Sequence, residues 1–224
     1  MRPILAVLFL LLAACTEGVP ADGKSRVLMM GDSLFGTHQL TGQSVGHVLE
    51  RRIDGPVTDR SVIGARMIYA LPISGSLGIK IARQYRAGPW EWVVLNGGGN
   101  DLWFGCGCGR CKGKLDRLIS PDGTQGEIPK LLARLRGTGA QVIYVGYLRS
   151  PGLGSPIEHC KNEADGLEGR IAALAKQDPG LTFLSLSDLV PEGDRSYHAL
   201  DMIHPSPKGA RAIAGRIADV IQAP

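Results

Sequence analysis

The segment RVLMMGDSL, residues 26–34, joins a short apolar run to a Gly-Asp pair and a serine. An apolar run that ends at turn residues is typical of a β-strand, so Ser33 is expected at the corner where a strand becomes a loop. Two later runs, WVVLN at 92–96 and QVIYVGYL at 141–148, are apolar and β-prone. Strands of this composition are usually buried on both faces, which is typical of a parallel sheet.

Segments with helical spacing alternate with these strands along the chain. Two further strand patterns, VTDRSVI at 57–63 and LTFLSL at 181–186, bring the alternation of strand and helix to about five repeats. Such an alternation predicts an α/β domain with a parallel sheet and helices on both faces. The segments predicted to be helical are 44–53, 77–88, 126–139, 163–177 and 206–222.

Composition indicates one soluble globular domain. The chain has 224 residues, of which 44% are hydrophobic and 21% are charged, and this suits a sizeable core. The formal charge of +4 is spread over scattered Lys and Arg residues, without a basic stripe interleaved with aromatic residues. This pattern argues against nucleic acid as a partner.

The N-terminus has the features of an export signal. Arg2 precedes the apolar run ILAVLFLLLAA, which is too short to span a bilayer but suits a secretory signal. The run ends in LAAC, residues 12–15, which resembles the lipobox of bacterial lipoproteins, in which the cysteine receives a lipid. We therefore expect a lipid on Cys15, and an ordinary signal peptide cut nearby is the alternative.

This interpretation divides the chain into three parts. Residues 1–14 are the expected signal peptide, 15–25 a flexible tether, and 26–224 a single domain. The signal implies an exported protein that is anchored by its lipid in the cell envelope. By the lipoprotein sorting rule, Thr16 after the cysteine implies the outer membrane, in a host that has one, with the protein facing the periplasm. That compartment is oxidising.

Polar residues that suit serine chemistry follow the predicted strands. Ser33 follows the first strand, Gly64 the second and Asn100 the third, while Asp201 and His204 lie just before the last helix. A serine hydroxyl needs a base to take its proton, and His204 fills this role if a carboxylate such as Asp201 orients its ring. The backbone N–H groups of Ser33 and Gly64 and the side-chain amide of Asn100 are candidate donors to an oxyanion.

Four short blocks in this order resemble the SGNH, or GDSL, hydrolase superfamily. They are GDSL at 31–34, SVIGAR at 61–66, GGND at 98–101 and DMIHP at 201–205, where the family has DxxHP. The elements between the blocks span nearly the whole chain after the signal. The resemblance implies a three-layer α/β/α sandwich with a flavodoxin-like, parallel, five-stranded sheet.

The resemblance also implies the chemistry. It implies hydrolysis of a carboxylic ester through a serine acyl-enzyme, with Ser33 as nucleophile, His204 as base and Asp201 as the acid that orients it. Ser33, Gly64 and Asn100 would form the oxyanion hole. No cofactor and no metal are expected. Asp32 and Asp101 belong to the motifs but are expected to be structural, because an aspartate beside a turn usually accepts hydrogen bonds from backbone N–H groups.

The segment GGGNDLWFGCGCGRC, residues 97–111, combines the Asn100 motif with three cysteines. With Cys160 they make four, and in an exported protein an even count indicates two disulfides, with three possible pairings. A bridge from the 106–111 loop to Cys160 would pin two active-site loops together. A zinc site of four thiolates and a redox pair are the alternatives. The cysteines concerned are Cys106, Cys108, Cys111 and Cys160.

Trp103 and Phe104 directly follow the Asn100 motif. We expect them to line the acyl or leaving-group pocket, and buried packing is the alternative. The other histidines are interpreted as surface or packing residues: His38, His47, His159 and His198.

The substrate class stays open at this point. A short-acyl carboxylesterase, a lipase or lysophospholipase, and a deacetylase of envelope sugars all fit the motif set. A chain this short leaves little room for a lid, which favours small acyl groups, acetyl included, or an accessible polymer ester. Two alternatives of another class are a non-catalytic envelope binding module on the same fold and a zinc-stabilised interaction protein built on the cysteines.

Overall fold

The computed structural model describes residues 26–152 and 154–223. In this part of the chain five strands form one parallel sheet in the order β2-β1-β3-β4-β5. The sheet confirms the predicted α/β class. The chain passes from β1 to β2 on one side and then to β3 on the other, so the connections reverse between β1 and β3, where such sheets bind ligands. The strands are β1 (Val27–Met30), β2 (Val57–Asp59), β3 (Trp92–Leu95), β4 (Gln141–Val145) and β5 (Leu181–Leu184).

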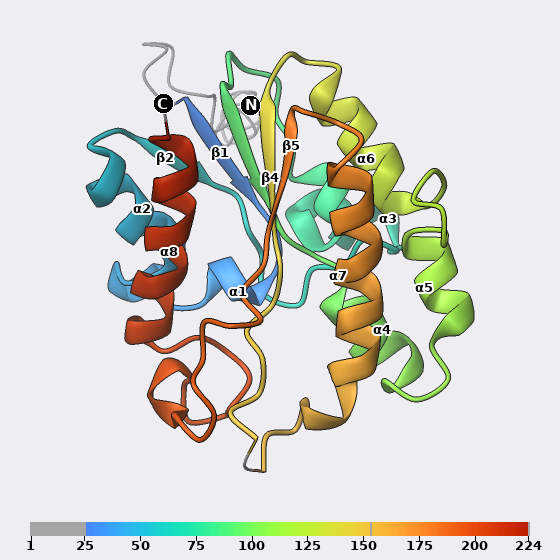
Figure 1. Cartoon of the computed structure of the whole chain (residues 1–224). Helices are drawn as coiled ribbons and strands as arrows, with labels where there is room; N and C mark the ends of the chain where they lie inside the picture. The colour runs from blue at the N-terminus through green and yellow to red at the C-terminus, as the bar shows by residue number, and fades with distance from the viewer. Residues whose placement is uncertain (1–25, 153, 224) are drawn as a thin grey trace, which may run out of the picture.

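Helices cover both faces of the sheet and give the expected three layers (Figure 1). On one face lie α1 (Ser33–Gly36), α2 (Val45–Ile53) and α8 (Pro207–Ile221). On the other lie α4 (Gly99–Cys106), α5 (Lys112–Leu118), α6 (Glu127–Arg136) and α7 (Lys161–Ala175). Short 3-10 helices are η1 (Gln39–Thr41), η4 (Glu158–Cys160) and η5 (Arg195–Tyr197).

Strand β1 is buried on both faces, as its composition indicates. Leu28 and Met30 belong to the core under α4–α7, whereas Val27 and Met29 belong to the core under α2 and α8. None of the four side chains is more than 3% exposed. At about 1.5–3 kcal/mol for each large apolar side chain removed from water, this burial holds β1 in the interior of the sheet.

The prediction of one helix over 77–88 is wrong. The region consists of α3 (Pro72–Ser74), a π-helical turn η2 (Gly75–Ile79) and a 3-10 turn η3 (Ile81–Arg83). Gly78 has a φ of 102°, which interrupts a helix. The backbone of Arg66 then forms a parallel bridge with Lys80, so these peptide groups bond across the chain instead of along a helix.

Strand β2 is shorter than the predicted 57–63. After Asp59 the chain keeps two backbone bonds to the β1 segment, from the N–H of Arg60 to the carbonyl of Met29 and from the N–H of Val62 to the carbonyl of Gly31. The last helix begins as predicted: Ser206 caps it by accepting a bond from the N–H of Gly209, and Pro207 is its first residue.

The predicted signal peptide, the tether and Cys15 lie outside the described residues. Among the residues that the structure describes, no helix combines the length and the apolar character needed to cross a bilayer.

Candidate active site

Ser33 lies at the carboxyl end of β1, at the first position of α1, and is 8% exposed. Asp32 caps this helix, since its Oδ1 accepts a hydrogen bond of 3.0 Å from the N–H of Leu34. The first N–H groups of a helix have no partner within it, so the N–H of Ser33 is available to an external acceptor. The corner thus presents a hydroxyl and an N–H donor from one residue.

Asp32 itself is buried in a network that joins three strands. The Asp32 N–H donates to Asn96 Oδ1 at 3.0 Å, and Asn96 Nδ2 donates to Asp32 Oδ1 at 3.1 Å. The Tyr147 hydroxyl donates to Asp32 Oδ2 at 2.6 Å. Burial raises the pKa of Asp32, against the effect of the donors that surround it. Gly31 is required here, because a Cβ on it would lie 1.9 Å from Asn96 Oδ1.

His204 and Asp201 form a tight pair on the loop before α8. Asp201 Oδ2 lies 2.6 Å from His204 Nδ1, and Asp201 Oδ1 accepts 3.0 Å bonds from the N–H groups of Ile203 and His204. Partial burial acts to raise the pKa of Asp201, but the bond from His204 and the backbone donors together lower it. A carboxylate on Nδ1 fixes the proton there and leaves Nε2 as the acceptor, the tautomer that a general base needs.

Other contacts hold the His204 loop against the rest of the site. His38 Nε2 bonds to the carbonyl of Pro205 at 3.0 Å, which ties the segment after α1 to this loop. The Ser155 hydroxyl, from the segment after β4, donates to the carbonyl of Met202 at 2.7 Å. Sequence reasoning gave neither residue a role in the site.

One pocket of about 190 Å³ brings the predicted residues of the site together. Ser33, Asn100 and His204 all line it, and Asp201 lies behind His204. Asn100 Nδ2 donates to the carbonyl of Ala65 at 3.0 Å, and its second N–H is left for a substrate oxygen.

Gly64 does not line this pocket. The next residue, Ala65, is joined to the pocket by the hydrogen bond that its carbonyl accepts from Asn100. Gly64 adopts a φ of 79°, a conformation that favours glycine, and the space its Cβ would occupy is open. The positive φ therefore explains a glycine at this position, in addition to the open approach that a residue without a Cβ leaves to its backbone N–H.

Only one of the two aromatic candidates lines the pocket. Trp103 lines the pocket, whereas Phe104 lies outside the lining and is 56% exposed. The rings stack with centroids 4.9 Å apart, and the Arg66 guanidinium lies 5.2 Å from the Phe104 centroid.

Asp101 has the structural role expected of it. Its two carboxylate oxygens accept 2.8 Å bonds from the N–H groups of Met67 and Ile68. Burial raises the pKa of Asp101 to about 6, against the effect of these two donors. The bonds fasten the start of α4, and therefore Asn100, to the segment that follows Gly64.

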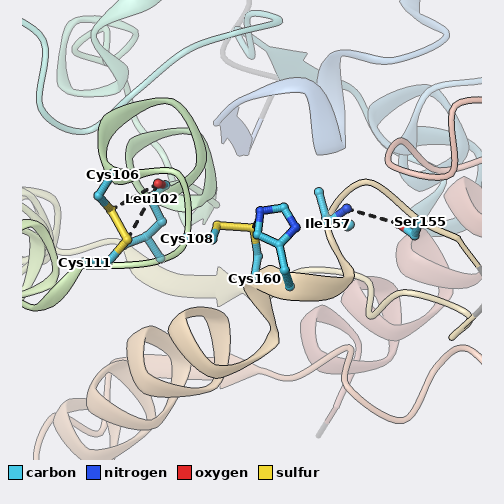
Figure 2. Close-up of a disulfide and its surroundings, with 8 residues drawn as sticks. Leu102, Cys106, Cys108, Cys111, Ser155, Ile157 and Cys160 are labelled. Carbon is cyan, nitrogen blue, oxygen red and sulfur yellow. Dashed lines mark hydrogen bonds between the residues drawn. A yellow bond between two sulfur atoms is a disulfide. The ribbon is translucent and has the colours of Figure 1, made fainter.

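The four cysteines form two disulfides, Cys106–Cys111 and Cys108–Cys160 (Figure 2). The second is the predicted bridge from the 106–111 segment to Cys160. Because all four sulfur atoms are bonded in pairs, none is a thiolate that could hold zinc, and the zinc alternative does not describe this structure.

Asn96 and Tyr147 were missed by sequence reasoning. Each follows the apolar run of a central strand, β3 for Asn96 and β4 for Tyr147. A polar residue at the carboxyl end of a buried strand is the signal that points to such positions.

The fold resembles known hydrolases in the solved structures. A member of the lipolytic protein G-D-S-L family from Veillonella parvula is 14% identical, with a TM-score of 0.62 and coverage of 88% of this chain and 98% of that chain. A carbohydrate acetylesterase from Sinorhizobium meliloti is 19% identical, with a TM-score of 0.53 and coverage of 89% and 99%. An active-site mutant of a family two carbohydrate esterase from Clostridium thermocellum is 14% identical, with a TM-score of 0.56 and coverage of 88% and 63%.

No curated protein matches the chain. Residues 29–212, however, match the model of the GDSL-like lipase/acylhydrolase family. This match spans most of the chain and includes all four sequence blocks. The chain therefore belongs to the GDSL-like lipase/acylhydrolase family, within the SGNH hydrolases.

Proposed function

We propose that this hydrolase of the ester type cleaves carboxylic esters with short acyl groups, acetyl included, through Ser33, His204 and Asp201. The observation that carries the proposal is the convergence of Ser33, Asn100 and the His204–Asp201 pair on one pocket. The pocket lies at the carboxyl ends of the strands, where the sheet's connections reverse.

The reaction proceeds in two halves. His204 Nε2 takes the proton of the Ser33 hydroxyl as Ser33 Oγ bonds to the ester carbonyl carbon, and the carbonyl oxygen becomes an oxyanion. The Ser33 N–H and the Asn100 amide donate to this oxyanion, and each such donor contributes about 3 kcal/mol to the transition state. When the intermediate collapses, its bond to the alcohol oxygen breaks and His204 returns the proton to the alcohol.

The second half releases the acid. A water molecule gives its proton to His204 and attacks the acyl-Ser33 carbonyl, and the carboxylic acid leaves as His204 reprotonates Ser33 Oγ. Asp201 stabilises the imidazolium in both halves without taking its proton.

Hydrolysis of p-nitrophenyl acetate by the purified chain tests this function. Ser33→Ala is expected to abolish the activity, and Ser187→Ala, at an exposed serine away from the pocket, is the matched control and retains it. A wild-type protein inactive on a broad ester panel, including acetylated glycans and lysophospholipids, would contradict the proposal and favour a non-catalytic envelope binding module.

We also propose that the enzyme is exported and anchored in the cell envelope through a lipid on Cys15. The LAAC sequence supports this proposal. Mass spectrometry of the protein isolated from the envelope should find a lipid-modified N-terminal cysteine. An unmodified Cys15 or cleavage at another position contradicts the anchor and leaves the proposed chemistry unaffected.

A further inference from the structure

The candidate pocket extends beyond the catalytic residues along an apolar wall. Besides Ser33 and His204 at one end, its lining includes Trp103, Leu148, Ile157, Ala164 and Leu167. These side chains come from α4, from the segment after β4 and from α7 and the segment before it. They are the side chains expected around a hydrocarbon chain.

The Cys108–Cys160 disulfide forms part of this wall, because both cysteines line the pocket. Cys108 follows the end of α4, and Cys160 is the residue before α7, so the bridge joins the end of one helix to the start of the other (Figure 2). The Cys106–Cys111 disulfide lies outside the lining and closes only the turn between α4 and α5.

Charged residues at the rim do not favour an anionic ligand. Arg149 bonds to both Glu168 and Asp165, and Lys161 bonds to Asp165. Their charges are therefore balanced by carboxylates of α7. Glu158, which also lines the pocket, adds a negative charge. A neutral acyl chain fits this environment better than a phosphate or a second carboxylate does.

The pocket has room for more than an acetyl group. Its volume is about 190 Å³, whereas one water molecule takes a share of about 30 Å³ in the liquid. An acetyl group therefore fills only a part of it. The volume suits an acyl chain several carbon atoms longer than acetyl.

We propose that this apolar end is the acyl-binding site for chains several carbons longer than acetyl, and that the Cys108–Cys160 bridge fixes its wall and thereby limits the chain length. This inference rests on the proposed function and narrows its substrate class. It assigns the bridge a part in specificity in addition to any part in stability.

A series of p-nitrophenyl esters tests the inference. Each methylene that enters the pocket is expected to raise kcat/KM about three- to fourfold, so the four additional methylenes of the hexanoyl ester should raise it about 80- to 250-fold over the acetyl ester. If the bridge limits the chain length, the dodecanoyl ester should bring no further gain over the hexanoyl ester. A highest kcat/KM on the acetyl ester, or a steady rise up to dodecanoyl, overturns the inference while ester hydrolysis itself stands.

Three variants locate the effect. Ala164→Phe fills the apolar end and should lower the hexanoyl-to-acetyl ratio of kcat/KM about tenfold. The double variant Cys108→Ser with Cys160→Ser releases the wall and should move the optimum toward longer chains. The matched control, Cys106→Ser with Cys111→Ser, removes the other bridge and should keep the wild-type ratio. Equal profiles for the two double variants overturn the role of the bridge.

A binding measurement makes the inference independent of turnover. Sodium hexanoate, added to the Ser33→Ala protein, should shift the backbone NMR signals of Ile157 and Ala164, and sodium acetate should leave them in place. If no ester is hydrolysed but these shifts occur, the proposed chemistry fails and the acyl site stands. If esters are hydrolysed but hexanoate leaves both signals unchanged, the acyl site is wrong.

Discussion

Replacing Tyr147 by phenylalanine removes one hydroxyl that joins two sides of the candidate site. The Tyr147 hydroxyl donates to Asp32 Oδ2 at 2.6 Å and accepts a bond of 3.0 Å from the N–H of Gly99. Asp32 directly precedes Ser33, and Gly99 directly precedes Asn100. Burial and the nearby Asp32 raise the pKa of Tyr147 well above 10.0, so the hydroxyl keeps its proton and remains a donor.

The expected loss of stability follows from these two bonds. A hydrogen bond to a carboxylate contributes about 2 kcal/mol, and a backbone N–H left without a partner costs about 1 kcal/mol. Tyr147→Phe should therefore lower the free energy of unfolding by about 3 kcal/mol. Because the same change loosens the residues before Ser33 and Asn100, kcat should fall about tenfold or more, with little change in KM.

Tyr144→Phe is the matched control. Its hydroxyl, from β4 itself, makes one bond of 2.8 Å to the neutral carbonyl of Gly97. The expected loss is about 1 kcal/mol, with kcat near the wild-type value. Urea unfolding of the three proteins at pH 7 measures the difference, and p-nitrophenyl acetate gives the kinetic constants. Equal losses of stability for the two variants, or an unchanged kcat for Tyr147→Phe, would refute the reasoning.

Three other changes probe the site and the loops around it. Asp201→Asn removes the carboxylate that fixes the tautomer of His204, so kcat on p-nitrophenyl acetate should fall by about 10⁴-fold, and a loss below tenfold would be contradictory. Burial lowers the pKa of His198 in the folded protein below its usual 6.5. Below about pH 6.5 the unfolded chain therefore binds a proton at His198 more readily than the folded protein does, and the free energy of unfolding declines as the pH falls. His198→Phe should remove this decline between urea unfolding at pH 8 and pH 5, and an unaltered pH dependence would count against it. Replacing both Cys108 and Cys160 by serine opens a 52-residue loop and should lower the free energy of unfolding, measured with urea, by about 4 kcal/mol. Removing the other bridge opens a five-residue loop and should lower it by about 2 kcal/mol.

The strands and helix starts were predictable because their signals are local. Within the segment 26–30, Val27–Met30 forms a strand whose side chains are all buried, and Ser206-Pro207 begins a helix where it was expected. In both cases the preferences of neighbouring residues agree with the packing. Gly78 shows the limit of this agreement, because the helical spacing around it is overridden by the backbone bridge between Arg66 and Lys80.

The residues that support the site were harder to predict, because their partners are distant in the sequence. Asn96 bonds to Asp32 across 64 positions, and Tyr147 bonds to it across 115. Only the order of strands in the sheet brings these side chains together. The pairing of the cysteines has the same origin, since Cys108 and Cys160 can meet because α4 and α7 cover the same face of the sheet.

The geometry of the triad depends on packing far from the reacting atoms. Ser33 follows the first strand of the described chain, whereas His204 precedes its last helix, so they meet only if α8 docks beside α2. The apolar face of α8 makes this contact through Ile213 and Ile217, which are fully buried. Since a mispositioned base costs far more in rate than in stability, activity should report the docking of α8 more sensitively than unfolding does. The short α1 is capped by Asp32, and its Leu34 and Phe35 belong to the same core cluster as Ile213 and Ile217 of α8.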